Sequence, residues 1–358
     1  MKIKFIPFSK FIKNLNLYKN EERVYILSSE LFNKITKTKH KIKIKYAVKV
    51  PCVIYNGKIY YHAGLVISFK KKLEGDICFI DLKYKHEKLY ENIESLLSFP
   101  TWIIFIDAFS KYMYDFIDYL NNLIETKKIN IVGAAIGDID FKQAPCFIYK
   151  GKTYKDAALI LGIKQNIDIE IAKGWEPLYG PLVVTQSKNN IILEINGEPA
   201  FNVYKYILKT KLNLDINKKN LKNFILKYPF GVISLSEDSY SIIYPIHTNG
   251  KKITTLSKIP IYTNLFIMKP NESAFLKSIS EASFKLYEKN KKNNIFVFSA
   301  LSRGKVLKNK ELERIKKINK DFPKKIFGFC TIGEITNIGF NNIKLIFGSN
   351  LVGALKYE

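Results

Sequence analysis

The sequence predicts an α/β (α+β) protein of two related domains, with mixed β-sheets flanked by helices. The main reason is internal similarity. The segment PCVIYNGKIYYHAGLVI at residues 51–67 matches PCFIYKGKTYKDAALIL at residues 145–161 at Pro, Cys, Ile, Tyr, Gly, Lys, Tyr and Ala in the same register. Similarity of this kind indicates that one supersecondary unit has been used more than once.

The repeated unit reads as strand, polar turn, helix, strand, glycine-rich turn with an acid, and paired strands. A short apolar run precedes each copy, at Val24–Ser29 and at Trp102–Ser110. A third relation lies near the C-terminus, where NIFVFSALS (Asn294–Ser302) leads to GFCTIGEI (Gly328–Ile335), which is similar to GAAIGDI (Gly133–Ile139). We therefore expect repeated strand–helix–strand–hairpin units in both halves of the chain.

Three segments have the spacing of amphipathic helices. The first covers residues 109–124, where apolar residues recur at the three- and four-residue spacing of a helix face. The second begins after Asn271, a residue type that favours the N-cap position, and the third covers Leu312–Phe322, directly before Pro323. We expect these helices to pack on the sheets.

The region between Gly162 and Gly197 has a different pattern. It contains the β-type runs PLVVTQ and NIILEING, which are joined by a turn at Ser187–Asn190. We expect a hairpin that bridges two domains, one at residues 1–196 with the internal duplication and one at residues 197–358.

Length and composition limit the function classes. A chain of 358 residues with 47% hydrophobic residues can form two ordered domains. Its apolar runs are too short for a membrane-spanning helix, which needs about 20 residues. The start, MKIKFIPF, lacks the apolar length and cleavage site of a signal peptide. We expect a cytoplasmic location without membrane insertion.

The formal net charge of +26 raises a nucleic-acid hypothesis, because lysine and arginine neutralise phosphates. However, Arg23, Arg303 and Arg314 are the only arginines in the sequence, and arginine is the residue that reads phosphates and bases bidentately. A compositional bias towards Lys, Asn and Ile explains the charge as well. A lysine-rich nucleic-acid- or ribosome-associated protein, with non-specific binding, is therefore kept as an alternative.

The sequence contains no recognisable metal, cofactor or catalytic motif. Its four cysteines lack the spacing of a zinc site, and Cys52 and Cys146 occupy the same place in the two copies. We expect these two to be buried; a disulfide between the copies is the alternative. The candidate nucleophiles Cys330 and Ser299 have no visible triad partners. We expect a binding protein without catalytic activity.

Several motifs, in order, resemble the FIST family. GWEPLYGPLVVT followed by IILEINGEPAFNVYKYIL (Gly174–Leu208) is similar to the junction of FIST proteins. Upstream, FIDAFS, NIVGAAIGD and FIYKGKTYKDAA resemble the family's FSDGxS, VxGGxAGD and F-x-NG-x-x-x-DGA stretches. Downstream, SALSRG (Ser299–Gly304) resembles its C-x-GRG turn, and GFCTIGEI resembles GFFTYGEI. The resemblance spans Val24 to Phe347.

The chain departs from the family pattern at three places. Ser299 or Ala300 stands where C-x-GRG has Cys, and Tyr244 and Pro245 stand where a basic residue is usual. Residues 340–342 (Phe, Asn, Asn) replace the family's His in the last segment. These differences bear on any function that needs the missing groups.

The resemblance implies a sensory module of an N-terminal and a C-terminal FIST domain that binds small molecules such as amino acids. Bacterial relatives are often fused to signalling output domains, and some are haem-binding nitric oxide sensors. Because this sequence ends at Glu358, we expect it to signal through a partner protein. A haem-binding gas sensor, with His62 or His247 as the iron ligand, is an alternative.

The candidate ligand site lies at the carboxyl ends of the repeated strands, where α/β proteins bind ligands. We expect the glycine-rich turns of the two halves to face each other around a shared cavity. Arg303 would bind the carboxylate of an amino acid, and Asp138 or Glu334 its ammonium group. The candidate residues are Asp107, Ser110, Gly133, Gly137, Asp138, Ser302, Arg303, Gly304, Thr331, Gly333 and Glu334.

Overall fold

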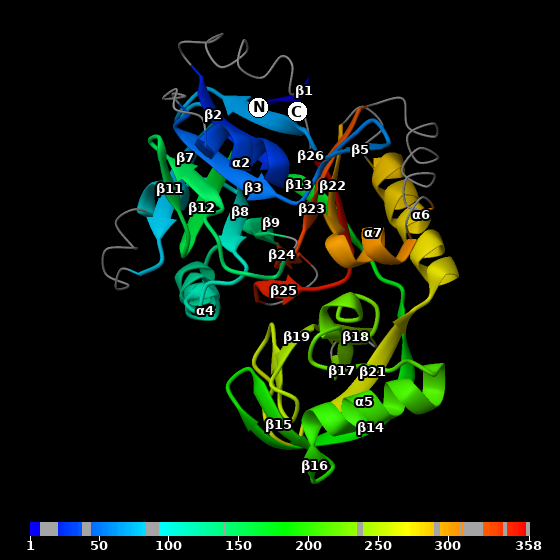
Figure 1. Ribbon diagram of the computed structural model, residues 1–358. Coiled ribbons are helices and arrows are strands. Elements are labelled where there is room, and N and C mark those ends of the chain that lie inside the picture. Colours follow the sequence, from blue (N-terminus) through cyan, green and yellow to red (C-terminus); the bar gives the residue numbers. More distant parts are fainter. Residues whose placement is uncertain are drawn as a thin grey trace.

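The molecule has two lobes, a large body and a small lobe below it (Figure 1). The computed structural model describes residues 1–7, 21–37, 44–83, 93–138, 140–234, 239–289, 294–307, 310, 325–338 and 342–355. The small lobe is formed by residues 175–270 and the body by the rest. The expected division at residues 196 and 197 falls inside the small lobe.

The body contains three six-stranded sheets. The first has the order β1 (Lys2–Pro7), β6 (Ala63–Phe69), β2 (Glu22–Ser28), β3 (Tyr46–Val50), β10 (Phe147–Tyr149), β11 (Lys152–Tyr154). The second has the order β7 (Gly75–Asp81), β12 (Ala157–Ile163), β8 (Thr101–Asp107), β9 (Asn130–Ile136), β24 (Gly333–Thr336), β25 (Lys344–Ile346). The third has the order β13 (Ile167–Ala172), β26 (Asn350–Leu355), β22 (Ile295–Ala300), β23 (Ile326–Thr331), β4 (Val53–Tyr55), β5 (Lys58–Tyr60).

The three sheets follow one plan. In each, a parallel pair (β2–β3, β8–β9 or β22–β23) lies at the centre, an antiparallel strand flanks the first member, and a hairpin flanks the second. We call the three chain segments that supply these parallel pairs unit 1 (β1 to β6), unit 2 (β7 to β12) and unit 3 (β13 and β22 to β26), in chain order. The hairpin always comes from another unit: β10–β11 of unit 2 completes the sheet of unit 1, β24–β25 of unit 3 that of unit 2, and β4–β5 of unit 1 that of unit 3.

The inner faces of the three sheets share one apolar core. It combines residues from all three units, including Ile26, Phe105 and Phe298 on the three first parallel strands. The central strands β8 and β22 are buried along their whole length, which explains their near-continuous apolar runs in the sequence. The mixed sheets and flanking helices confirm the predicted fold class.

Helices cover the outer faces of the body. They are α2 (Ser29–Lys37), the short η1 (Glu94–Leu96), α4 (Met113–Ile124), α6 (Glu272–Lys289) and α7 (Leu301–Leu307). α4 lies within the first predicted helical segment and buries Met113, Phe116 and Leu120. The Asn271 side chain caps α6 by accepting a hydrogen bond from the backbone N–H of Ala274 at 3.0 Å. The predicted helix at Leu312–Phe322 lies outside the described residues.

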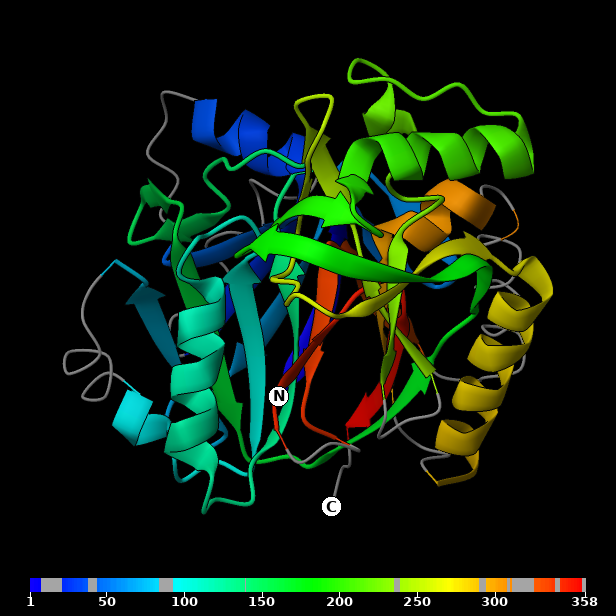
Figure 2. The same cartoon turned by 90° about the horizontal axis from the view of Figure 1, so that it is seen from below.

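The small lobe is a sheet folded around α5 (Ala200–Leu212) and the turn η2 (Leu221–Asn223); Figure 2 shows it nearest the viewer. The strand order is β18 (Ser239–Ile243), β17 (Phe230–Ser234), β21 (Asn264–Pro270), β14 (Trp175–Lys188), β15 (Ile191–Ile195), β20 (Ile253–Thr255), β19 (Pro245–Thr248), with β16 (Glu198–Pro199) beside β15. β14 and β15 form the predicted hairpin, in which Lys188 pairs with Ile191. Within the described residues, none of the helices has the length and apolar character to cross a membrane.

A disulfide joins unit 1 to unit 3. It links Cys52, before β4, to Cys330 on β23, and the two Cα atoms are 5.3 Å apart. The alternative of a bridge between Cys52 and Cys146 is therefore wrong: Cys146 is a free, fully buried thiol. The physical reason is the hairpin exchange, which places the start of each hairpin beside a strand of a different unit. Disulfides are uncommon in the cytosol, except in hyperthermophiles.

Reduction of this disulfide should lower the stability of the protein. The bond closes a loop with a sequence separation of 278 residues, so the chain-entropy model assigns it up to about 5 kcal/mol. We expect a reductant to lower the urea midpoint of the wild type and to leave that of Cys52→Ala unchanged. Cys78→Ala, a change at a buried free thiol, is the control and should keep the response. Equal midpoints of the wild type with and without reductant would contradict the prediction.

Candidate functional site

The carboxyl ends of the unit 2 and unit 3 strands meet the small lobe. The Tyr114 hydroxyl on α4 bonds to the Ser257 hydroxyl of the lobe at 2.6 Å, and the Tyr244 hydroxyl of the lobe bonds to Ser302 on α7 at 2.7 Å. The edge predicted to bind ligand is therefore an interface between the body and the small lobe (Figures 1 and 2).

Asp107 and Ser110 belong to a buried polar cluster in unit 2. Asp107 Oδ2 accepts the backbone N–H of Asp156 at 2.8 Å, and its Oδ1 accepts that of Phe109 at 3.0 Å. The Gln143 amide and the Ser110 hydroxyl both donate to Asp156 Oδ1, at 2.6 and 2.9 Å. Burial raises the pKa of Asp107 against the opposing effect of these hydrogen bonds. These hydrogen-bond donors are all paired with carboxylate oxygens of the protein itself, so this cluster stabilises the turns of unit 2.

Asp138 is paired with a buried lysine. The Lys49 ammonium group, on β3 of unit 1, lies 2.9 Å from Asp138 Oδ2, and the lysine is only 2% exposed. The Asp138 carboxylate, which we expected to bind the ammonium group of a ligand, is therefore already paired with Lys49. A buried ion pair of this kind fixes how units 1 and 2 meet, since removing one partner leaves an uncompensated charge.

Glu334 is the predicted acid with capacity left for a ligand. It lies on β24 and is fully buried, opposite Ala134 of β9. The Thr331 hydroxyl donates to Glu334 Oε1, whereas Oε2 has no hydrogen-bond partner among the described residues. Burial raises the pKa of Glu334 to about 8, despite opposing effects from Thr331, the Ser349 amide and the Arg303 charge. Burial thus favours the neutral form of Glu334, and one of its buried oxygens lacks a hydrogen-bond partner among the described residues.

Arg303 has a structural role that the sequence did not indicate. Its guanidinium group donates to the carbonyl oxygens of Ala172 at 3.3 Å and Phe275 at 3.0 Å, and it stacks on the Phe275 ring at 4.4 Å. The residue is fully buried. Arg303 therefore ties α7 to the end of β13 and the start of α6, and it acts on Glu334 through its charge.

The predicted glycines have different surroundings. A Cβ at Gly133 would collide with the Ile104 backbone, so this glycine serves the β8–β9 contact. At Gly137 a Cβ would lie 2.6 Å from the Phe109 ring, and at Gly333 it would lie 2.6 Å from the Phe347 ring. Gly304 faces open space. The turns do come near one another, since β24 pairs with β9, but aromatic rings lie directly on two of them.

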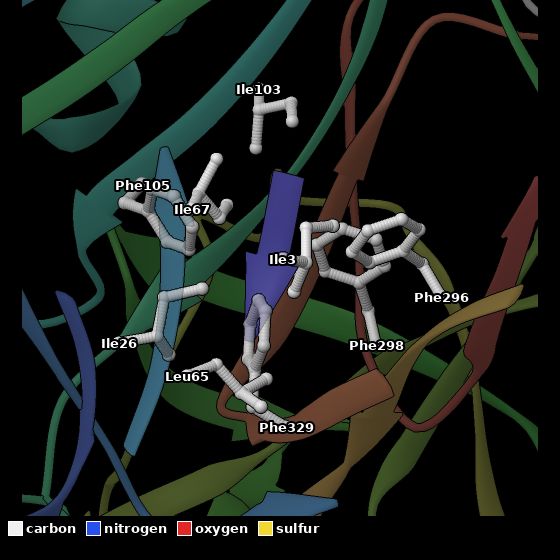
Figure 3. A pocket seen from close by; sticks show the side chains of 9 residues that line it. All are labelled: Ile3, Ile26, Leu65, Ile67, Ile103, Phe105, Phe296, Phe298 and Phe329. Carbon is white, nitrogen blue, oxygen red and sulfur yellow. The ribbon is translucent and has the colours of Figure 1, made fainter. Parts of the chain in front are cut away.

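A small cavity lies elsewhere, inside the apolar core of the body. Figure 3 shows its lining, with no polar atom exposed to it. The lining residues are Ile3, Ile26, Leu65, Ile67, Ile103, Phe105, Phe296, Phe298 and Phe329. It has room for little more than one water-sized molecule and offers no hydrogen-bonding group. It therefore does not suit the polar ligand that the sequence led us to expect.

The histidines considered for haem lie outside apolar pockets. The His62 side chain is 71% exposed, and its Nε2 is 2.6 Å from Glu30 Oε2. His247 is exposed on β19. Within the described residues, no group of three or more His, Cys, Asp or Glu side chains is arranged to hold a metal ion.

Sequence reasoning missed three residues of the site region. Lys49 is the one charge in the buried run YAVKV, and that signal could have marked it. Asp156 lies in the second copy where the first has His62, a difference visible in the repeat. The sequence marks Tyr244 only as a departure from the family pattern, and its bond to Ser302 across the two lobes joins residues far apart in the chain.

The fold defines a two-lobed α+β module, and comparison with known proteins identifies its family. Residues 52–198 match the FIST N domain and residues 200–337 match the FIST C domain. The chain belongs to the FIST family, whose domains are small-ligand sensory domains of signal transduction. It is also similar to the Uncharacterized protein MJ1623 of Methanocaldococcus jannaschii, with 30% identity over 118 residues. That match covers 30% of this chain and 23% of the relative, so the chain spans about a quarter of the relative's length.

Glu334→Gln should change how stability depends on pH. A carboxyl group whose pKa is raised on folding stabilises the protein below its unfolded pKa, near 4.5, and this contribution is lost as the pH rises to about 8. We therefore expect the free energy of unfolding of the wild type to fall relative to Glu334→Gln, by about 1.4 kcal/mol per pH unit in that interval. Urea unfolding of both proteins across this range measures the difference. A constant difference would show that Glu334 ionises normally.

Proposed function

We propose that this protein binds a small polar molecule with an ammonium group, amino acids included, at Glu334. The observation that supports the proposal is the partnerless Oε2 of this fully buried carboxyl group. A buried polar atom without a hydrogen bond is costly, so a ligand that supplies a donor gains the free energy of satisfying it. Because an ammonium group also stabilises the ionised acid, Glu334 would release its proton when such a ligand binds.

The surroundings of Glu334 suit a compact ligand. The Thr331 hydroxyl donates to one oxygen of the acid, and the Ser349 backbone amide also favours its ionised form. A few polar groups placed around a buried charge are typical of sites that bind small polar molecules. Arg303 would contribute by its charge, because its Nη atoms already bind carbonyl oxygens.

A thermal-shift screen of amino acids and simple primary amines tests this function. We expect at least one compound to raise the melting temperature of the wild type, and this rise to disappear in Glu334→Gln, which cannot become an anion. Glu281→Gln, a change at an exposed acid of α6, is the matched control and should keep the response. A screen without any stabilising compound, on folded protein, would count against the proposal.

We further propose that the protein reports its ligand to a partner protein, without catalysis, in the cytoplasm. The support is the sensory character of the family and the lack of a recognisable catalytic motif in the sequence. The engaged hydrogen bonds around Asp107 and Asp156 also favour a structural role over acid–base chemistry there.

Non-specific nucleic-acid binding is a second candidate, and one feature of the small lobe favours it. Residues 205–227 contain seven lysines, all exposed, and Asp215 as the one acid. The exposed Tyr206 lies on α5 among them, where it could stack on a base. The lysines are Lys205, Lys209, Lys211, Lys218, Lys219, Lys222 and Lys227.

Charge reversal in this lysine-rich segment, residues 205–227, tests the second candidate. If the segment binds nucleic acid, the logarithm of the association constant for single-stranded RNA should fall linearly with the logarithm of the salt concentration. The double variant Lys209→Glu/Lys218→Glu should weaken binding and flatten the salt slope by about 1.4, since each phosphate contact on a single strand contributes about 0.7. Lys152→Glu, in the body, is the control. If the salt slope is the same for the double variant and for Lys152→Glu, the lysine-rich segment does not bind the RNA.

A further inference from the structure

The Cys52–Cys330 disulfide lies at the strand end that holds Glu334. Cys330 and Thr331 are the last two residues of β23, and the Thr331 hydroxyl donates to Glu334 Oε1. The backbone N–H of Cys330 also donates to the Cys52 carbonyl at 2.9 Å. The end of β23 is therefore fixed to unit 1 by a covalent bond and a hydrogen bond, one residue before the side chain that contacts the acid.

The same contact occurs without a disulfide in the other two hairpin exchanges. By strand register, the disulfide residues correspond to Cys146 and Lys49 where the unit 2 hairpin meets unit 1. They correspond to Gly333 and Ala135, a direct pair, where the unit 3 hairpin meets unit 2. The Lys49 N–H donates to the Cys146 carbonyl at 2.8 Å, as in the disulfide pair. Two of the three hairpins are thus held without a covalent bond, so we expect the reduced protein to remain folded.

A short hairpin at the edge of the sheet gives access to the bond. Cys52 and Cys330 are 2% and 6% exposed, so a reductant reaches them only when the structure opens locally. Cys52 precedes β4, and β4 and β5 are three-residue strands, with β5 at the edge of the unit 3 sheet. Short edge elements open more easily than central strands. A dithiol then transfers two electrons to the bond: two cysteine thiols form, and the dithiol becomes a disulfide.

We propose that the Cys52–Cys330 disulfide is a redox switch that sets the affinity of the Glu334 site. This inference rests on the proposed function, because it describes how binding at the same acid is regulated. In the oxidised protein the end of β23 is fixed, so Thr331 holds Oε1 and the carboxyl group is oriented for a ligand at Oε2. In the reduced protein this strand end has more freedom, and a ligand must order it on binding. Reduction therefore weakens binding.

A switch also accounts for a disulfide in a protein that we propose to be cytoplasmic. Outside hyperthermophiles, cytosolic disulfides are usually transient and serve catalysis or redox sensing. This bond joins two units beside the proposed binding site, so its formation can change binding. The protein then responds to two inputs, a small amine and the redox state of its surroundings.

Hydrogen exchange of the full-length protein tests the first step. Mass spectrometry compares the oxidised protein with protein in dithiothreitol, and alkylation reports which thiols are free. We expect reduction to speed the exchange of residues 51–60, in the released hairpin, and of residues 329–335, around the acid. Residues 147–154, in the equivalent hairpin without a disulfide, are the control and should not change. If residues 329–335 exchange at the same rate in both states, or if reduction unfolds the protein, the switch is overturned.

Titration calorimetry with ethanolamine tests the effect on binding. We expect the oxidised protein to bind ethanolamine about tenfold more tightly than the reduced protein, which corresponds to about 1.4 kcal/mol, the size of one hydrogen bond. Cys52→Ala should bind like the reduced wild type and should not respond to dithiothreitol. Cys146→Ala, a change at the equivalent position of the unit 2 hairpin, is the matched control and should keep the response. Equal affinities of the oxidised and reduced wild type would contradict the switch.

Thr331→Val tests whether the disulfide acts through the hydroxyl group. Valine has nearly the same shape as threonine and lacks the donor to Glu334 Oε1. We expect this variant to bind ethanolamine as weakly as the reduced wild type, and reduction to cause no further loss, because both changes remove the same interaction. A second loss of about tenfold on reduction of the variant would show that the disulfide acts independently of Thr331, and the switch as described would be wrong.

The two proposals fail in different ways. If no amine binds to the oxidised wild type, the proposed function is wrong, and control of the strand end by the disulfide is decided by the exchange of residues 329–335. If ethanolamine binds through Glu334 with equal affinity in both redox states, the function is supported and the switch is wrong.

Discussion

The exchange of hairpins between the three units is the constraint on which the body depends. The second parallel strand of each unit (β3, β9 or β23) would be an open sheet edge by itself, with unpaired backbone groups. In this protein the hairpin of another unit covers each of these edges, and the apolar faces of all three sheets then meet in a common core. No unit can complete its sheet alone. The arrangement of the body follows from a cycle of three such contacts.

This exchange also decides which side chains become neighbours. The start of each hairpin lies beside a strand of a different unit, so that Cys52 meets Cys330 and the backbone of Cys146 binds that of Lys49. In unit 3 the hairpin carries Glu334 to the end of β9. The polar groups at the strand ends therefore belong to composite sites. Each depends on two units.

The sequence predicted several single elements well because periodicity and capping residues are local signals. It indicated α4, the cap of α6 and the β14–β15 hairpin, and it placed Glu334 at a strand end. It could not indicate that Lys49 neutralises Asp138 or that Tyr244 bonds to Ser302, because each contact joins residues far apart in the chain. The role of Arg303 was missed for a related reason: arginine binds carbonyl oxygens as readily as carboxylates, and the sequence does not show which is near.

The difference between the units explains why the proposed ligand site belongs to only one of them. By strand register, Glu334 corresponds to Val53 in unit 1 and to Phe147 in unit 2. These residues pair with Ala134, Phe329 and Val48, which are the partners of Phe105, Phe298 and Ile26 on the first parallel strands. The apolar residues complete the packing, whereas the acid introduces a buried polar group that packing alone does not need. The small lobe is inserted between β13 and β22, two strands of the unit 3 sheet. The repeated scaffold thus has an apolar residue at this position in two units and, in the third, the acid for which we propose a binding role.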